Sequence, residues 1–200
     1  LNVTALESRL YGGRLDGSIA FFPKMSAAAQ GGLLVRDADG KTVIDNVLPG
    51  LPFLVDGRLD AGLQLGTDEQ GLWMRGRVGI HRGRIADGNW ARELVGAALA
   101  EVGAAGAMDE VVAMNRPLLG ADAMRFERMA LDFESRGGAV TLPRVVVDLP
   151  GASLRGRGEI AADRSVTLTA ALWPDAPLAA TLTSAAPALA RARDADGKPV

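Results

Sequence analysis

The chain has 200 residues, and its 22 lysines and arginines against 24 aspartates and glutamates leave a net charge of -2, which argues against nucleic acid as the main partner. It contains no cysteine, so disulfides, metal thiolates and a thiol nucleophile are excluded. Apolar residues make up 48% of the chain but aromatic residues only 4%, so any core or apolar lining must be built of Leu, Val and Ala.

The front part of the chain, residues 1–86, is predicted to form β hairpins. Apolar and polar residues alternate over 3–10 and 14–22, and a glycine pair between these segments favours a turn. The same alternation returns over 59–66 and 72–81. Because alternation places every second side chain on one side of a strand, each pair predicts a hairpin with one apolar face.

A helical insertion is predicted over residues 87–118. Asn89 is a suitable N-cap, and Gly103 can end the first helix. A weaker second helix covers 107–114 and ends before a proline. We expect the first helix to dock on the sheet rather than on a lipid surface, because its polar face lacks the lysines of interfacial helices. Its apolar positions recur at four-residue spacing: Trp90, Leu94, Ala98 and Val102.

The back part, residues 119–184, predicts an antiparallel meander. Four alternating segments follow one another over 126–173, with Gly137-Gly138 as one of the turns. Pro143 is expected to mark a bulge or sheet edge at which the alternation changes parity. Residues 185–200 are interpreted as a terminal linker.

Residues 1–200 together predict a single mainly β domain. The expected fold is a curved antiparallel sheet, U-shaped, half-open like an incomplete barrel or solenoid-like, with one or two short helices between its two β halves. The 25 glycines, well above the average of about 7%, are interpreted as bends and bulges rather than as an anion-binding loop, because no strand, loop and helix context of a nucleotide fingerprint accompanies them.

Residues suited to catalysis or metal binding are sparse. His81 is the single histidine, and Asp39-Gly40 is explained by a tight turn better than by an incomplete calcium loop. Asp132 and Glu134 fall on the polar side of a strand, where nothing would raise the pKa of either carboxyl. We therefore expect no enzyme activity, no metal site and no cofactor.

No run of about 18 apolar residues is present, so no membrane-spanning helix is predicted. The chain starts at Leu1 rather than at a methionine, and we expect it to be a piece of a longer protein.

Three stretches in a fixed order carry a resemblance to a known family: LYGGRLDGSIAF, then GLWMRGRVGIHRGRIADGNWARELV, then RFERMALDFESRGGAVTLPRVVVDLPGASLRGRGEIAADRSVTLTAAL. In this order they resemble the C-terminal region of AsmA-like proteins, over about residues 6–182. The helix start at Asp87-Gly88-Asn89-Trp90 and the glycine step from Gly156 to Gly158 match the family pattern. Two features depart from it: Met124-Arg125-Phe126 lacks the usual preceding threonine, and the family usually continues into a further strand beyond Val200.

The resemblance implies a bacterial envelope protein that is anchored in the inner membrane by a helix outside this chain and projects into the periplasm. It implies an elongated, U-shaped sheet whose apolar face carries phospholipid or another envelope lipid between inner and outer membranes in support of outer-membrane biogenesis. Envelope assembly proteins are possible further partners. Alternation alone does not distinguish an open lipid groove from a closed core, so a structural or assembly module with a closed sheet is the alternative.

Two sets of candidate residues follow from the lipid hypothesis. Four arginines around one hairpin are candidates for lipid headgroup contact, with an ordinary solvated sheet face as the alternative: Arg75, Arg77, Arg82 and Arg84. Apolar residues of the alternating segments are the candidates for facing the acyl chains: Leu63, Leu65, Leu72, Met74, Val78, Met129, Leu131, Phe133, Val145, Val147, Leu149, Leu154, Ile160, Val166, Leu168 and Leu172.

Overall fold

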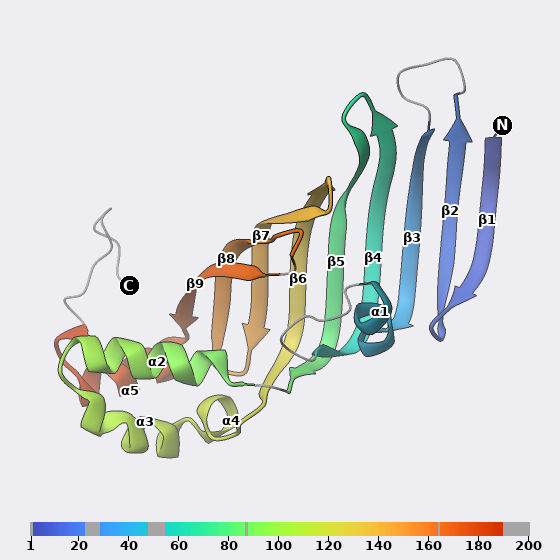
Figure 1. Ribbon diagram of the computed structural model, residues 1–200. Coiled ribbons are helices and arrows are strands. Elements are labelled where there is room, and N and C mark those ends of the chain that lie inside the picture. The colour runs from blue at the N-terminus through green and yellow to red at the C-terminus, as the bar shows by residue number, and fades with distance from the viewer. Residues whose placement is uncertain (1, 23–28, 48–54, 87, 164, 190–200) are drawn as a thin grey trace.

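The computed structural model describes residues 2–22, 29–47, 55–86, 88–163 and 165–189. It contains a nine-stranded antiparallel sheet in which every strand pairs with the strands that precede and follow it in the chain (Figure 1). The sheet is not closed, and β1 and β9 form its two edges. The mainly β prediction is confirmed. The strands are β1 (Asn2–Leu10), β2 (Gly13–Phe21), β3 (Ala29–Asp39), β4 (Val55–Asp68), β5 (Gly71–Ile85), β6 (Met124–Arg136), β7 (Ala139–Leu149), β8 (Ala152–Ile160) and β9 (Val166–Pro174).

The helices lie together at one end of the strands, in the segments that connect or follow the strands there (Figure 1). We call this end the helix end, and the opposite end, which carries the β4–β5, β6–β7 and β8–β9 turns, the hairpin end. The helices are α1 (Gly40–Val47), α2 (Trp90–Glu101), the 3-10 turn η1 (Ala105–Ala107), α3 (Met108–Met114), α4 (Arg116–Leu119) and α5 (Ala176–Ala185). Among the described helices, none combines the length and apolar character needed to cross a membrane.

The predicted helical insertion is confirmed between β5 and β6. The side chain of Asn89 accepts a hydrogen bond from the Arg92 backbone N–H, and Gly103 follows the helix with a φ of 74°. The helix docks as expected and contacts β9. Its most buried residues, however, are shifted by one position from the predicted set, which is half-buried. They are Ala91, Val95 and Leu99.

Two elements in the front half differ from the predictions. Strand β3 was not expected, and α1 replaces the predicted tight turn at Asp39-Gly40. The Asp39 carboxylate accepts hydrogen bonds from the backbone N–H and the hydroxyl of Thr42, at 2.8 and 2.6 Å, and so satisfies a donor at the start of the helix. The aspartate therefore acts as a helix cap rather than as a hairpin residue.

The four alternating segments predicted over residues 126–173 form β6 to β9, but the remainder of the range 119–184 forms the helix α5 rather than sheet. Asp175 begins this helix, and its carboxylate accepts a hydrogen bond from the Leu178 N–H at 3.0 Å. Pro177 lies in the first turn, where backbone N–H groups make no intrahelical hydrogen bond, so the absence of an N–H on proline costs nothing. Leu178 is buried beneath the helix.

The irregularity expected at Pro143 is confirmed as a bulge in β7. Between Thr141 and Arg144 the register against β6 shifts, and β7 contributes one more residue than its neighbour. The same shift occurs against β8. As a result, the apolar side chains of β7 change from even to odd positions without leaving their face of the sheet.

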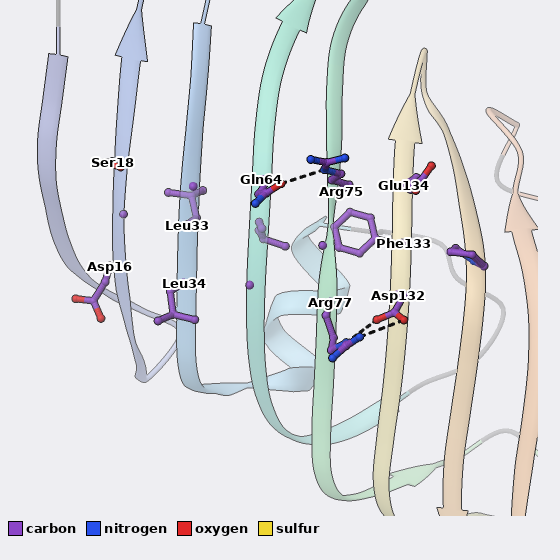
Figure 2. A pocket seen from close by; sticks show the side chains of 16 residues that line it. Asp16, Ser18, Leu33, Leu34, Gln64, Arg75, Arg77, Asp132, Phe133 and Glu134 are labelled. Atoms are coloured by element: carbon purple, nitrogen blue, oxygen red, sulfur yellow. Dashed lines mark hydrogen bonds and ion pairs between the residues drawn. The ribbon is translucent and has the colours of Figure 1, made fainter.

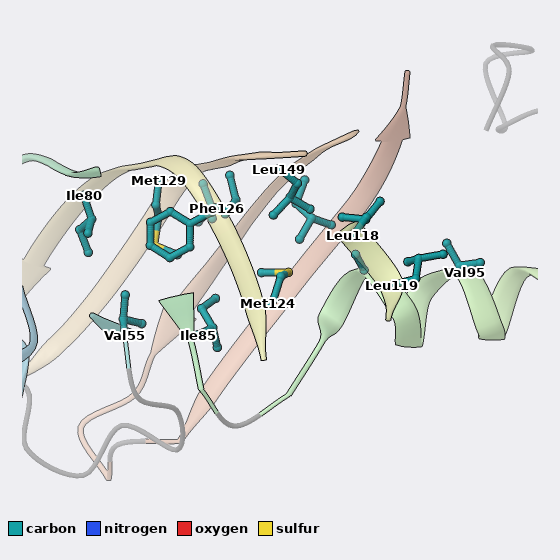
Figure 3. Packing of buried hydrophobic residues seen from close by; sticks show 14 of the residues in the cluster. Val55, Ile80, Ile85, Val95, Leu118, Leu119, Met124, Phe126, Met129 and Leu149 are labelled. Carbon is teal, nitrogen blue, oxygen red and sulfur yellow. The ribbon is translucent and has the colours of Figure 1, made fainter. Parts of the chain in front are cut away.

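The hydrophobic core lies at the helix end (Figure 3). There Ile85 and Leu119 are completely buried, and Met124 is 1% exposed. Residues from β3 to β8 pack together with the buried sides of α2, α3, α4 and α5. The helices thus close one end of one face of the sheet.

Candidate functional site

One face of the sheet is apolar from β2 to β9. The register aligns its side chains in rows that cross the strands, such as Val35, Ala61, Val78 and Leu131. None of the described side chains in these rows is charged. We call this surface the apolar face; its members are Leu15, Gly17, Ile19, Gly31, Leu33, Val35, Leu59, Ala61, Leu63, Leu65, Leu72, Met74, Gly76, Val78, Ile80, Met129, Leu131, Phe133, Val140, Leu142, Val145, Val147, Leu149, Leu154, Gly156, Gly158, Ile160, Val166, Leu168, Ala170 and Leu172.

Glycines on this face lie beneath larger side chains of neighbouring strands. At Gly76, an added Cβ would clash with the carbonyl oxygen of Gly62 and lie 3.1 Å from the Leu63 Cα and from one of its methyl groups. Leu63 therefore covers the backbone of β5 at a position where a side chain would not fit. At Gly76 the glycine is therefore required by close packing, and no register shift marks a bulge there.

The register places every candidate lipid-facing residue on the apolar face, but their exposure divides them into three groups. Five are buried in the core at the helix end: Met129, Val145, Val147, Leu149 and Leu154. Nine are half-buried: Leu63, Leu65, Met74, Val78, Leu131, Phe133, Ile160, Val166 and Leu172. The last two, Leu72 and Leu168, are 61% and 38% exposed.

The buried group corrects the sequence-based expectation that the whole set faces lipid. These five side chains pack against other protein side chains, so they belong to a closed core. The same face is therefore part of a closed core at one end and an open surface at the other. It is closed at the helix end and accessible toward the hairpin end.

The hairpin end carries exposed apolar side chains at its rim. Phe21, the last residue of β2, and Phe22 after it are 42% and 37% exposed, and Leu72 is the second residue of β5. These side chains keep a large part of their apolar surface in contact with water. Clusters of this kind commonly mark surfaces that bind lipid, ligand or protein.

The opposite face of the sheet is polar, and two of the candidate headgroup arginines lie on it (Figure 2). Arg75 donates a hydrogen bond to the Gln64 side chain at 3.0 Å and lies over the Trp73 ring at 5.6 Å. Arg77 pairs with Asp132 at 2.6 Å. The hydrogen bond from Arg77 is the main cause that lowers the pKa of the Asp132 carboxyl below its ordinary value.

The other two arginines are also separated from the apolar face. Arg84 contacts Asp56 at 3.0 Å across β4 and β5, on the polar face. Arg82 is exposed at an irregular position with a φ of 51°. Arg75, Arg77 and Arg84 pair with polar groups on the face opposite the candidate lipid-facing residues, and Arg82 is exposed to water, so these arginines fit the alternative, a solvated sheet face.

A shallow hollow of about 780 Å³ lies on the polar face across β2 to β7 (Figure 2). It forms because Gly32 and Gly62 contribute no side chains to this layer, while Asp16, Arg77 and Glu134 stand around it. Sequence reasoning missed it because it depends on β3, which the alternation did not reveal. Within the described part of the chain, no three His, Asp or Glu side chains are grouped so that they could hold a metal ion.

Comparisons with protein families, with curated proteins and with solved structures found no match for this chain. The functional inference therefore rests on the geometry of the sheet and on the resemblance of the three stretches described above.

Proposed function

We propose that this chain is a non-catalytic lipid-binding module of the bacterial cell envelope. Its apolar face takes up phospholipid acyl chains at the hairpin end. One observation supports this proposal above the others: the apolar face is continuous across an unclosed sheet, yet the helices cover it at one end only. The resemblance to AsmA-like proteins supplies the setting, a periplasmic body joined to the inner membrane by an anchor outside this chain that conducts lipid toward the outer membrane.

The energetic argument comes from the half-buried residues. Transfer of one CH₂ group from water to an apolar environment contributes about 0.8 kcal/mol when burial is complete. A chain lying on an open face is buried on one side, so roughly half of that value applies, and about ten methylenes contribute about 4 kcal/mol. Binding on this scale is weak and reversible, which suits a protein that hands lipid on.

The first test is the lipid content of the protein. The chain is purified without detergent, extracted with organic solvent and analysed by mass spectrometry. We expect co-purified phospholipid in a reproducible molar ratio. A lipid-free extract, together with no uptake from vesicles of phosphatidylethanolamine and phosphatidylglycerol, would contradict the proposal.

The second test uses photo-crosslinking at neighbouring positions that point to opposite faces. A photoreactive amino acid replaces Leu63 or Met74 on the apolar face, and Gln64 or Arg75 serves as the matched control one residue along the same strand. We expect lipid adducts at the first two positions and few at the controls. Equal labelling on both faces would show that contact with lipid is unspecific.

A structural or assembly role is the alternative, and the β9 edge favours it. Val166–Pro174 contains no charged residue and pairs with β8 without a register shift. Edge strands are usually protected by charges or bulges, as β1 is by Glu7, Arg9 and a register shift. An edge strand without charges or bulges is suited to pairing with another strand where the helices leave it free.

This alternative predicts a different set of results. The protein would retain no lipid, and it would associate through the β9 edge. Thr169→Lys should then abolish the association in sedimentation velocity, whereas Thr141→Lys on the inner strand β7 should leave it unchanged.

A further inference from the structure

The apolar face has a direction, because burial decreases along the strands from the helix end to the hairpin end. On β5, Ile80 is 1% exposed, Val78 is half-buried and Leu72 is 61% exposed. The neighbouring strand β4 repeats the trend, since Leu59 is 3% exposed and Leu65 is half-buried. The apolar face is therefore exposed at the hairpin end and becomes covered by protein toward the helix end. We call the covered part the floor.

The floor is formed by protein side chains. Leu119 and Ile85 have no exposed surface, and Val95 of α2 is 2% exposed (Figure 3). Among the described residues, no buried side-chain polar atom lacks a hydrogen-bond partner at this end. A charged headgroup has no compensating partner there, and burying one without a partner is strongly unfavourable.

The length of the accessible part limits what it can hold. From Leu72 to Val78 the path along β5 is roughly 20 Å, at about 3.3 Å per residue. One leaflet of a bilayer has a hydrocarbon thickness of about 15 Å, half of the usual core. An acyl chain of ordinary length therefore fits along a strand with its polar end outside the rim.

We propose that acyl chains enter this face from the hairpin end with the terminal methyl leading, lie along the strands, and stop at the core that the helices cover. The headgroup then stays in water beyond the rim at Phe21 and Leu72. This inference rests on the proposed lipid binding and adds the orientation of the bound chain. In this arrangement the helices limit how far an acyl chain can insert along the strands.

The experiment measures depth along one strand. Because the chain has no cysteine, a single introduced cysteine can carry a bimane fluorophore without background labelling. Leu72→Cys reports on the rim, Val78→Cys reports on the deep part, and Gln64→Cys is the control on the polar face. Leu131→Cys is a second deep position in case labelling at residue 78 disturbs the fold, which circular dichroism checks.

The labelled proteins are mixed with phosphatidylglycerol that carries a nitroxide quencher either near the headgroup or near the terminal methyl of one acyl chain. We expect the methyl-end nitroxide to quench the deep labels at least twofold more than the rim label, and the headgroup-end nitroxide to show the opposite order. Equal quenching by both probes at rim and deep positions, or a reversed order, would overturn the orientation while leaving lipid binding intact. Quenching no greater than at the Gln64→Cys control would overturn the proposed function as well.

Discussion

Asn89 offers a sharp test of how the helices are fixed to the sheet. Its side chain is 4% exposed and makes three hydrogen bonds with three different segments of backbone. The Oδ1 atom accepts from the Arg92 N–H at 3.1 Å, while Nδ2 donates to the carbonyl oxygens of Leu118 and Ala121 at 2.7 and 3.0 Å. One amide thus caps α2 and joins it to α4 and to the segment leading into β6.

The expected cost of Asn89→Ala is the sum of these losses. Removal of an N-cap side chain costs about 1 kcal/mol. Each carbonyl left without a partner in a buried site costs about 1 to 3 kcal/mol, less where water can reach it. We therefore expect a decrease in the free energy of unfolding of about 3 to 5 kcal/mol, a large part of the 5 to 15 kcal/mol typical of a domain.

Urea denaturation followed by circular dichroism gives this free energy by linear extrapolation. Asn89→Ser retains a capping oxygen but not the two donors, so it should recover about 1 kcal/mol of the loss. Asn115→Ala serves as the control, because among the described residues its amide donates only to the Val111 carbonyl oxygen of the helix that it follows and is only half-buried. A decrease of less than about 1 kcal/mol for Asn89→Ala would refute the reasoning that this amide holds the helices in place.

Two further predictions concern the sheet itself. Gly83→Ala should destabilise the protein by more than about 2 kcal/mol, because an added Cβ would clash with the Phe126 ring and a carbonyl of β4. Gly62→Ala is the control and should change the urea midpoint little, since no atom lies within 4 Å of its Cβ position. The Asp132 carboxyl has a pKa below its ordinary value, so its pair with Arg77 stabilises the fold above about pH 4 and loses this effect as the pH falls through the folded-state pKa. The difference in urea midpoint between the native chain and Asp132→Asn should therefore be small but measurable at pH 7 and shrink progressively as the pH is lowered below about 4. A difference that does not change with pH would exclude the carboxylate as its source.

Much of the sheet could be predicted because its strands are half-buried. In β4 to β6, one face packs or lies against apolar groups and the other meets water, so the residues alternate. Strand β3 lacks this signal. Gly31-Gly32 at its start and the unbroken run Leu33-Leu34-Val35 conceal the period of two, since Leu34 lies on the polar face with 37% of its surface exposed.

Local signals for the two unexpected helices were present but ambiguous. Asp39-Gly40 fits a tight turn and a helix start equally well, and only Thr42 distinguishes them, through its two hydrogen bonds to the aspartate. Asp175 followed by Pro177 is a clear helix start, which the preceding alternation of β9 obscured.

The candidate site could be predicted only in part, for a physical reason. Alternation determines on which face Leu63 or Val147 lies, but not what covers that face. Val147 is completely buried because helices distant in sequence pack over its end of the sheet. Coverage of this kind depends on long-range packing, which periodicity does not encode.

The order of the strands has a consequence for how such a protein can change in size. Because each strand contacts mainly its neighbours in sequence, the sheet is close to one-dimensional, and its stability approximates a sum over adjacent hairpins. Insertion of a hairpin between two strands would widen the apolar face without changing the remaining pairings. In the proposed binding mode, the number of strands would therefore set how many acyl chains the face accommodates, and the helices would separately set how deep each chain inserts.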